Sequence, residues 1–221
     1  MIDVGPQTLV LVPTEIERRH LAAQPGFGAD APCELCGFGP VAAAARAASL
    51  IALHKPERVV LTGIAGTFDP AGLPVGTAAI FPRVIMHGVG IGVASGFVSA
   101  ATLGFQHWPK IGSGPEGFDE LVVDAPVPPA AGQLLTCCTG SASPEEARLR
   151  QDQYPHVVAE DMEGFAVALA CRLAGVPLVI ARGVSNEVGD RNHDRWQIPK
   201  ALDAAWLIVS DLLSRNSWDK E

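Results

Sequence analysis

The chain has 221 residues, of which 48% are hydrophobic and 18% are charged. This apolar content excludes an intrinsically disordered chain and predicts one compact domain with a large core. The formal net charge of -8 disfavours a nucleic-acid groove, because phosphate binding needs clustered Lys and Arg and the sequence has no such run. We therefore expect a small-molecule partner and no nucleic acid.

The sequence contains no signal for a membrane or for secretion. No apolar run reaches the length of a membrane span, and residues 1–13 contain Asp3 and two prolines without a basic start. We expect a cytoplasmic protein with a flexible tail over residues 1–6. Cys33 and Cys36 form a lone CxxC pair, and the five cysteines follow no ordered framework. We interpret them as reduced thiols, and we predict no metal site and no cofactor.

Hydrophobic patterns in the first part of the chain predict strands and helices of one sheet. Residues 9–13 form an apolar strand, and a helix begins near Thr14, with Glu17 three residues later as in a capping box. A Gly-Pro turn leads into a second helix over residues 41–53, whose alanines allow close approach to a sheet. Residues 58–62 are again a fully apolar strand, which ends at a Gly-Ile-Ala-Gly stretch.

The rest of the chain continues this alternation. Residues 77–104 are glycine-rich and strand-like, and residues 106–118 look like an exposed loop. Further strands are predicted at 133–139, 157–161 and 177–184, and further helices at 144–153, 162–174 and 199–213. Without an internal repeat or a linker, this pattern predicts one domain over residues 1–221, a three-layer α/β/α sandwich with a central mixed, mostly parallel sheet.

Polar side chains gather where two buried strands end, which is where an open α/β sheet binds its ligand. Glu163 follows the strand at 157–161. Its carboxylate is a bidentate acceptor for a vicinal diol such as that of ribose; the alternative is an acid that caps the next helix. Asn186 follows the strand at 177–184. Its amide can donate to N7 and O6 of a 6-oxopurine; the alternative is a turn former. Glu17 is either a capping-box partner or part of the same site.

Five stretches, in order along the chain, resemble the nucleoside phosphorylase and nucleosidase superfamily, which has the purine nucleoside phosphorylase fold. They are VPTEIE at 12–17, CGFGPVAAAARAA at 36–48, LTGIAG at 61–66, AEDMEG at 159–164 and ARGVSN at 181–186. The resemblance runs over nearly the whole chain. Within the superfamily, the stretch SNEVGDRNHDRWQIPKAL at 185–202 is most similar to futalosine hydrolases of the alternative menaquinone pathway.

This resemblance implies roles for the residues in the motifs. Glu163 matches the carboxylate that holds the ribose diol, and Glu17 matches the acid that orients and deprotonates the attacking water. Asn186 contacts the purine, Ser185 orients Asn186, and Met162 packs against the sugar. The other residues of the motifs that are implied to bind substrate or to support the acidic cluster are Ala65, Gly66, Asp161 and Arg182.

The residue at position 186 bears on the choice of purine. The similar methylthioadenosine/S-adenosylhomocysteine nucleosidases carry Asp there and use it as an acid toward adenine N7. Because Asn186 cannot protonate a purine, the resemblance implies hydrolysis of futalosine to hypoxanthine and dehypoxanthine futalosine. Phosphorolysis is a minor alternative, because Glu17 stands where phosphorylases place cations. The same motifs are also compatible with an adenine-specific nucleosidase and with a non-catalytic nucleoside-binding protein.

Two cations and a tryptophan follow the last motif, namely Arg191, Arg195 and Trp196. One interpretation is a solvated loop in which Asp190 and Asp194 form local ion pairs. The other is that the cations reach the carboxylate of futalosine's benzoate arm, with Trp196 packing on that arm or anchoring the loop. The resemblance also implies a homo-oligomer, a dimer or larger, that acts on a small nucleoside.

Overall fold

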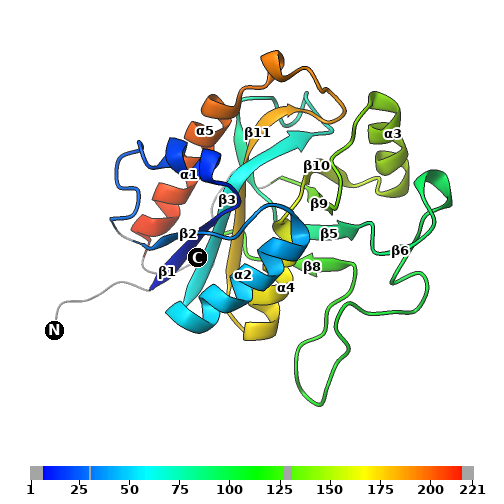
Figure 1. The fold of residues 1–221 in the computed structure, drawn as a ribbon, viewed down its shortest axis with the longest axis horizontal. Helices are drawn as coiled ribbons and strands as arrows, with labels where there is room; N and C mark the ends of the chain where they lie inside the picture. Colours follow the sequence, from blue (N-terminus) through cyan, green and yellow to red (C-terminus); the bar gives the residue numbers. More distant parts are fainter. Residues whose placement is uncertain (1–6, 30, 127–130, 216–221) are drawn as a thin grey trace.

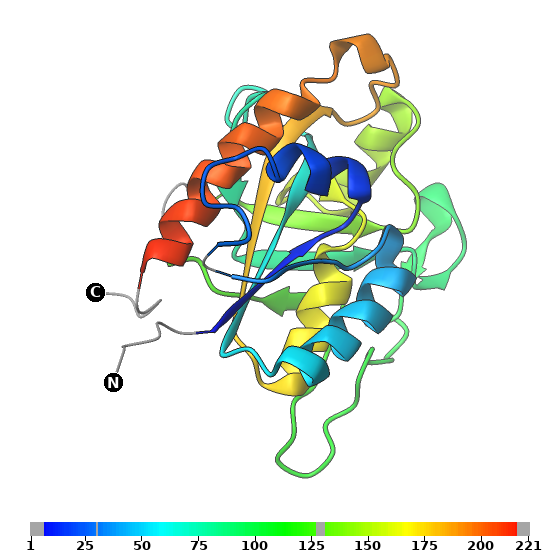
Figure 2. The same ribbon diagram turned by 60° about the vertical axis from the view of Figure 1, so that its left-hand side comes forward.

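A central sheet with helices on both faces makes up the protein, as Figure 1 and the turned view in Figure 2 show. The computed structural model describes residues 7–29, 31–126 and 131–215. Within these ranges nine strands form one sheet, and parallel pairs outnumber antiparallel ones. The predicted three-layer sandwich is confirmed. The tail predicted over residues 1–6 lies outside the described residues.

Strand β3 (Arg58–Thr67) is the centre of the sheet. It pairs in parallel with β1 (Thr8–Val12) and with β11 (Leu178–Glu187), and β1 pairs in parallel with β2 (Cys33–Leu35). The last residues of β3 form an antiparallel pair with β10 (Val157–Asp161). The second half of β3 therefore lies beside the carboxyl ends of both β10 and β11.

The remaining strands extend the sheet on the far side of β10. They are β9 (Gln133–Cys137), β5 (Arg83–His87) and β8 (Glu120–Val122), with β4 (Ala78–Ile80) paired to β11. Between β5 and β8 the chain leaves the sheet. It forms a separate pair of strands, β6 (Gly90–Ile91) and β7 (Val98–Ser99), with a 3-10 turn, η1 (Ala94–Gly96), between them.

Each face of the sheet is covered by a pair of helices. Helices α2 (Gly39–His54) and α4 (Gly164–Ala174) pack together on one face, and α1 (Glu15–Leu21) and α5 (Ile198–Ser214) pack together on the other, as Figure 2 shows. Helix α3 (Pro144–Gln153) lies beside η1. Thr14 caps α1 in a complete capping box and Ser143 caps α3, as the sequence predicts.

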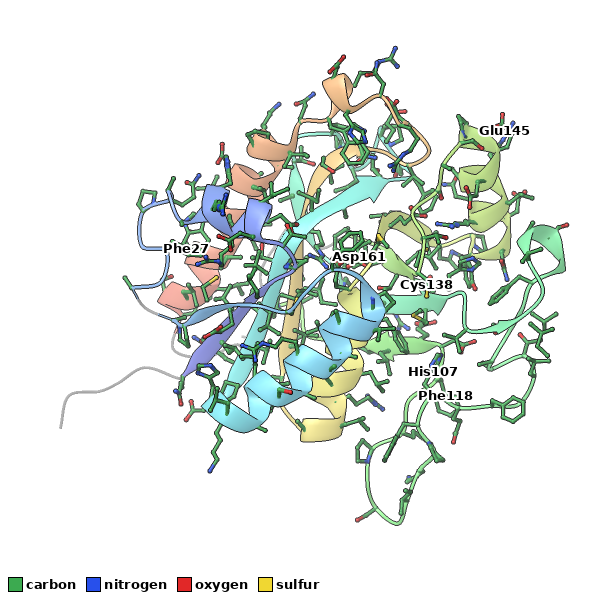
Figure 3. All side chains as sticks on the ribbon, viewed as in Figure 1. Phe27, His107, Phe118, Cys138, Glu145 and Asp161 are labelled. Carbon is green, nitrogen blue, oxygen red and sulfur yellow. The ribbon has the colours of Figure 1, made fainter. Side chains whose placement is uncertain are left out.

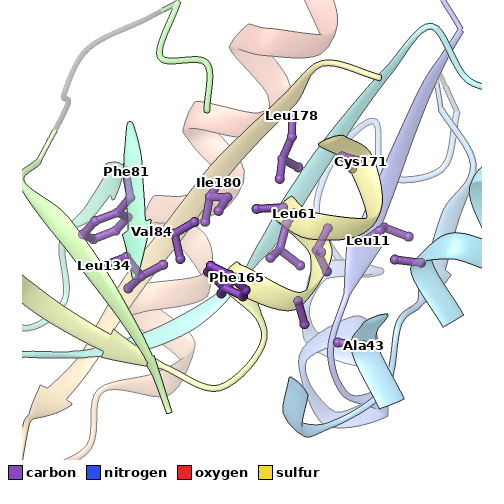
Figure 4. Close-up of a cluster of buried hydrophobic side chains, with 14 of the residues drawn as sticks. Leu11, Ala43, Leu61, Phe81, Val84, Leu134, Phe165, Cys171, Leu178 and Ile180 are labelled. Carbon is purple, nitrogen blue, oxygen red and sulfur yellow. The ribbon is translucent and has the colours of Figure 1, made fainter. Parts of the chain in front are cut away.

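The sequences of β3 and β11 are apolar because both faces of these strands are buried. Leu61 and Ile180 pack with Phe165 under α2 and α4, as Figure 4 shows, while their neighbours Val60 and Val179 face α5. Alternate residues of a strand point to opposite faces, so a strand covered on both sides needs a continuous apolar run. Each fully buried side chain of this size contributes about 1.5 to 3 kcal/mol to stability.

Two strands run further than their apolar patterns indicate. β3 continues past the predicted end at residue 62, and Gly63 adopts a φ of 143°, which a residue with a side chain rarely adopts. β11 continues past residue 184, with a register shift between Val184 and Asn186. Both predicted ends are therefore wrong, because the later residues of each strand pair with the other strand although they are small or polar.

Other boundaries also differ from the prediction. α4 begins at Gly164, so Met162 and Glu163 lie in the bend before the helix and not in its first turn. The three-residue strands β2 and β8 are missing from the prediction, because their mixed sequences, CEL and ELV, carry no periodic pattern.

Neither a membrane-spanning helix nor a disulfide occurs in the described ranges. None of the helices in the described ranges is long and apolar enough to cross a bilayer. All five cysteines lie in those ranges and are free thiols, as expected. Burial raises the pKa of Cys33 and of Cys36 to about 12, so both stay protonated near neutral pH.

Candidate active site

A cavity of about 670 Å³ opens where β10 and β11 end beside the second half of β3. Small-molecule sites usually occupy about 300 to 1,000 Å³. Figure 3 shows two lining residues, Asp161 and Cys138, near the centre of the molecule. The residues predicted from the sequence that line the cavity are Glu17, Ala65, Gly66, Asp161, Met162, Glu163, Ser185, Asn186, Arg191 and Trp196. The structure does not place Arg182 or Arg195 in the lining.

Glu163 is buried in the bend between β10 and α4. Its Oε1 accepts a hydrogen bond from the backbone N–H of Gly39 at 2.9 Å, and its Oε2 accepts one from Nη2 of Arg182 at 3.2 Å. The carboxylate makes no cap on its own helix and binds the first turn of α2, where Phe38 provides no side-chain cap. The capping role therefore exists, but it serves a different helix from the one predicted.

Burial raises the pKa of Glu163 to about 7. The guanidinium of Arg182 and the N–H of Gly39 favour the charged form and oppose this rise, whereas the nearby Asp161 adds to it. The carboxyl group therefore changes charge near neutral pH, which is unusual for a glutamate and typical of a functional site.

Arg182 is completely buried behind the cavity wall and binds the carboxylates of Asp161 and Glu163. Its Nε and Nη2 donate to Oδ2 of Asp161 at 3.1 and 2.7 Å, and its Nη1 donates to the carbonyl oxygen of Thr62 at 3.1 Å. Burial acts to lower the pKa of Arg182, but the surrounding carboxylates, Asp161 first, raise it above its ordinary value. Because these contacts occupy the guanidinium, Arg182 supports the acidic cluster and does not face the cavity as an anion site.

Glu17 takes part in a capping box and also lines the cavity. It completes the capping box of α1, in which its Oε2 accepts from the N–H of Thr14 at 3.0 Å and from Oγ1 of Thr14 at 2.5 Å. Its Oε1 accepts from the N–H of Ile64 at 3.0 Å, and the residue is buried against the cavity. Three donors therefore fix this carboxylate at the wall.

Gly63 allows Glu17 and Arg182 to approach the same point of β3. A Cβ added at Gly63 would lie 2.6 Å from Oε1 of Glu17 and 2.6 Å from Nη1 of Arg182. A side chain at residue 63 would therefore force Glu17 and Arg182 to move, so the glycine is part of the geometry of the site.

Asn186 is oriented by its neighbour. Oγ of Ser185 donates to Oδ1 of Asn186 at 2.7 Å, and Nδ2 of Asn186 donates one hydrogen to the carbonyl oxygen of Glu187 at 2.8 Å. The amide oxygen already accepts from Ser185, and the hydrogen that Asn186 still has to donate to a ligand is the second one on Nδ2. A ligand atom that meets this hydrogen has to be a hydrogen-bond acceptor.

The segment after β11 brings one of the two predicted cations to the cavity. Arg191 lies over the ring of Trp196, with 5.4 Å from its guanidinium carbon to the ring centroid, and both line the cavity. Nε1 of Trp196 donates to the carbonyl oxygen of Asp190 at 3.0 Å, which anchors the loop. Arg195 is exposed, with a nitrogen 3.8 Å from a carboxylate oxygen of Asp190, so it forms the local ion pair of the solvated-loop interpretation.

Some of the lining was not predicted. It includes Phe38, His193, Glu160 and the loop after β9, residues 138–142. The loop follows a strand that runs parallel to β10, so the strand-end rule that indicates Glu163 applies to it as well. Glu160 belongs to the AEDMEG motif and precedes Asp161 at the end of β10, so the same strand-end signal indicates it.

Residues 27–214 match the phosphorylase superfamily. The chain belongs to this superfamily. It is 37% identical over 183 residues to a futalosine hydrolase from Streptomyces coelicolor, with 80% of this chain and 75% of the relative covered. It is 31% identical over 194 residues to a 5'-methylthioadenosine/S-adenosylhomocysteine nucleosidase from Colwellia psychrerythraea, with 84% of this chain and 79% of the relative covered. The protein is an enzyme of their class, an N-glycosyl hydrolase.

Solved structures share the fold of this superfamily member. One is the Colwellia psychrerythraea nucleosidase in complex with adenine, with a TM-score of 0.74, 20% identity and 95% of both chains covered. Another is the native futalosine hydrolase of Helicobacter pylori, with a TM-score of 0.70, 16% identity and coverage of 93% of this chain and 97% of that chain.

Proposed function

We propose that this enzyme hydrolyses the N-ribosidic bond of a 6-oxopurine nucleoside, and that futalosine is its substrate in menaquinone biosynthesis. The products are hypoxanthine and dehypoxanthine futalosine. The observation that carries the proposal is the fixed amide of Asn186, which presents an N–H and no acid, at one end of a cavity lined by Glu17 and Glu163.

The sugar end of the cavity stabilises positive charge. Cleavage of an N-ribosidic bond passes through an oxocarbenium-like ribosyl cation, so anions beside the sugar bind the transition state more tightly than the substrate. Glu163 holds the ribose diol, Glu17 orients and deprotonates the attacking water, and Met162 packs on the sugar. Arg182 keeps Asp161 and Glu163 in place.

The purine end stabilises negative charge on the leaving group. Hypoxanthine has acceptors at N7 and O6, and the second Nδ2 hydrogen of Asn186 donates to this edge as charge builds on the ring. Adenine has an amine at position 6, which brings a donor against a donor at this amide. The site therefore favours hypoxanthine.

Hydrolysis is favoured over phosphorolysis by the charges beside the sugar. Glu17 lines the cavity from the first turn of α1, and an acid there repels phosphate. The cations on the same helix are already paired, because Nε of Arg18 contacts Glu15 at 2.7 Å and Nε of Arg19 contacts it at 3.0 Å. Water is therefore the proposed nucleophile.

The test is incubation of the enzyme with futalosine, inosine and methylthioadenosine, each with and without phosphate. The expected result is free hypoxanthine from futalosine without phosphate. Phosphate-dependent formation of a ribose 1-phosphate, or release of adenine alone, would contradict the proposal. The second outcome would support an adenine-specific nucleosidase, which the similarity to the Colwellia enzyme keeps open. Tight nucleoside binding without any release of purine would indicate a non-catalytic binding protein.

The Asn186→Asp variant is expected to lower activity on 6-oxopurine nucleosides and to raise the ratio of adenine to hypoxanthine release. An aspartic acid can protonate adenine N7, whereas its carboxylate repels O6 of hypoxanthine and leaves a polar group unpaired at a cost of about 1 to 3 kcal/mol. The measurement is the ratio of kcat/KM for inosine and adenosine. An unchanged ratio would show that selectivity lies in other residues.

The Arg191→Ala variant is expected to lose more affinity for futalosine than for inosine. Arg191 lies over Trp196 at the cavity, and its proposed role is to bind the carboxylate of the benzoate arm, which inosine lacks. Because that arm is remote from the bond that breaks, the loss should appear chiefly in KM. Arg195→Ala is the matched control, since Arg195 does not line the cavity. An equal loss for both substrates would return Arg191 to a structural role.

The pH profile is expected to show an acidic limb near pH 7. Glu163 holds the diol as an anion, and its pKa of about 7 makes it neutral at lower pH, so kcat/KM should fall as the pH drops through this value. The effect of pH on the stability of the fold has the opposite sign. A raised pKa stabilises the fold below the unfolded value of about 4.3, and this contribution is lost as the pH rises through about 7. A profile without this limb would contradict the role of Glu163.

We also propose a homo-oligomer. Large apolar side chains are exposed on the segment between β5 and β8, which leaves the sheet: Val89, Ile91, Val93, Phe105, Trp108 and Ile111. An exposed group of this kind is typical of a protein interface, and a second copy of the chain is the proposed partner. Light scattering after size exclusion should give at least twice the mass of one chain; the mass of one chain would contradict the proposal.

A further inference from the structure

A second buried pair of an arginine and a carboxylate lies on the opposite face of β10 from Arg182. Glu160 precedes Asp161 in β10, and successive residues of a strand point to opposite faces. The carboxylate of Glu160 contacts the guanidinium of Arg150 from α3, and these residues are 8% and 5% exposed. The steps at the sugar do not use this pair, although Glu160 lines the cavity.

Glu160 holds the loop after β9 by two bonds. The backbone N–H of Ser141 donates to Oε1 of Glu160 at 2.8 Å, and Oγ of Ser141 donates to Oε2 at 2.7 Å. The carboxylate also accepts from the thiol of Cys137 at 3.7 Å. Burial, followed by the charge of Glu160, raises the pKa of this thiol well above its ordinary value, so the thiol remains a donor.

Arg150 holds the same loop from the other side. Its Nη2 donates to Oγ1 of Thr139 at 3.3 Å and to Oε1 of Glu146 at 3.1 Å. Glu146 in turn accepts from the backbone N–H of Ala142 at 2.8 Å. The ion pair and its neighbour Glu146 therefore hold residues 139, 141 and 142 of one cavity wall.

This wall leads to the segment that follows Asn186, and both line the same cavity. The loop continues into Ser143, and a Cβ added at Gly189 would lie 2.6 Å from the carbonyl oxygen of Ser143. Gly189 has a φ of 87°, so glycine is required both by the backbone and by the close approach. The loop over residues 138–142 therefore ends against Gly189, three residues after Asn186, and we assign it to the purine end of the cavity.

A buried ion pair is a poor way to stabilise a fold, because the cost of removing both charges from water often exceeds their attraction. An apolar pair of similar size would serve a core at least as well. Here the carboxylate accepts from the donors of a cavity loop, which an apolar pair cannot do. The pair therefore determines the position of the loop more than it adds to stability.

We propose that Glu160 and Arg150 are positioning residues of the purine pocket, whose ion pair holds the loop over residues 138–142 against the purine and so sets its affinity. This inference rests on the proposed function, in which the purine lies beside Asn186. It predicts that loss of the pair weakens the binding of the purine and leaves the sugar end unchanged.

The test is a calorimetric titration of the full chain with hypoxanthine, with adenine and with base-free sugar prepared by acid hydrolysis of futalosine. The variants are Glu160→Gln and Ser141→Ala, and the control is Arg148→Ala on the exposed face of α3. Each lost hydrogen bond is expected to weaken the binding of the purine. Kd for hypoxanthine should therefore rise about tenfold in Glu160→Gln and about threefold in Ser141→Ala. Kd for the base-free sugar should not change, and the control should match the wild type.

Two results would overturn the inference. One is an unchanged Kd for both purines in Glu160→Gln, and the other is an equal loss for the purine and for the base-free sugar, which indicates general disruption. Wild-type protein that binds neither purine would overturn it as well. If Glu160→Gln does not fold, Ser141→Ala decides, because it removes one hydroxyl and leaves the ion pair intact. Turnover of futalosine by the wild type tests the proposed function separately, since the titrations need no turnover.

Discussion

Replacing Glu163 by Gln is expected to lower kcat/KM by about 10- to 150-fold, because a hydrogen bond to a charged group contributes about 1.5 to 3 kcal/mol. The anion that holds the ribose diol disappears, while the shape of the side chain is kept. The loss should be larger in kcat than in KM, since the oxocarbenium ion gains more from the anion than the neutral substrate does. Steady-state kinetics with futalosine at about pH 8 measures both.

The fold of the Glu163→Gln variant should survive. Burial raises the pKa of Glu163 to about 7, so the charged form is costly in the folded state, and Gln removes that cost. Gln also keeps an acceptor for one of the two donors, Gly39 and Arg182. Glu145→Gln is the matched control, because the side chain of Glu145 is 71% exposed on α3. Near-normal rates with a normal melting curve would remove Glu163 from the site.

The Glu17→Gln variant is expected to lower kcat by about 10² to 10⁴, the usual contribution of a general base. Gln cannot take the proton of the attacking water. It can still complete the capping box with Thr14, because Gln serves at that position as well as Glu does. The start of α1 should therefore stay intact while the chemistry fails. The measurement is kcat for futalosine together with the melting temperature.

The same turn of helix supplies the control for Glu17. Glu15 contacts Arg18 and Arg19 at the surface, and the cavity lining does not include it. Glu15→Gln should therefore keep wild-type rates. If Glu17→Gln keeps more than about a tenth of the wild-type kcat, another group activates the water, and the capping box would be the whole role of Glu17.

The sequence predicts the elements that have strong local signals. The capping box at Thr14, the strand β10 and the amphipathic helix α5 all appear close to their expected places. These signals are local, because a cap or a buried face depends on residues a few positions apart. The extensions of β3 and β11 have no such signal, since they depend on pairing between residues about 120 positions apart.

The candidate site shows the same limit. The motifs at the strand ends indicate Glu163 and Asn186, but they do not indicate that the carboxylate of Glu163 caps α2. The contact between Glu160 and Arg150 joins a strand to a helix, and their hold on Ser141 depends on the path of a loop. The exposed position of Arg195 depends on the turn in which it lies. Such contacts are decided by tertiary packing.

Gly63 restricts how this enzyme can diverge. Any side chain at this position would displace the proposed base Glu17 and the buried Arg182 together, since an added Cβ would lie 2.6 Å from each of them. The φ of 143° adds backbone strain to these two contacts, so a substitution at Gly63 is expected to impair the enzyme. We expect descendants of this chain to keep the sugar end almost unchanged. New substrate preferences should then arise on the part of the cavity wall formed by Arg191 and Trp196, which make none of the contacts that hold Glu17 and Arg182.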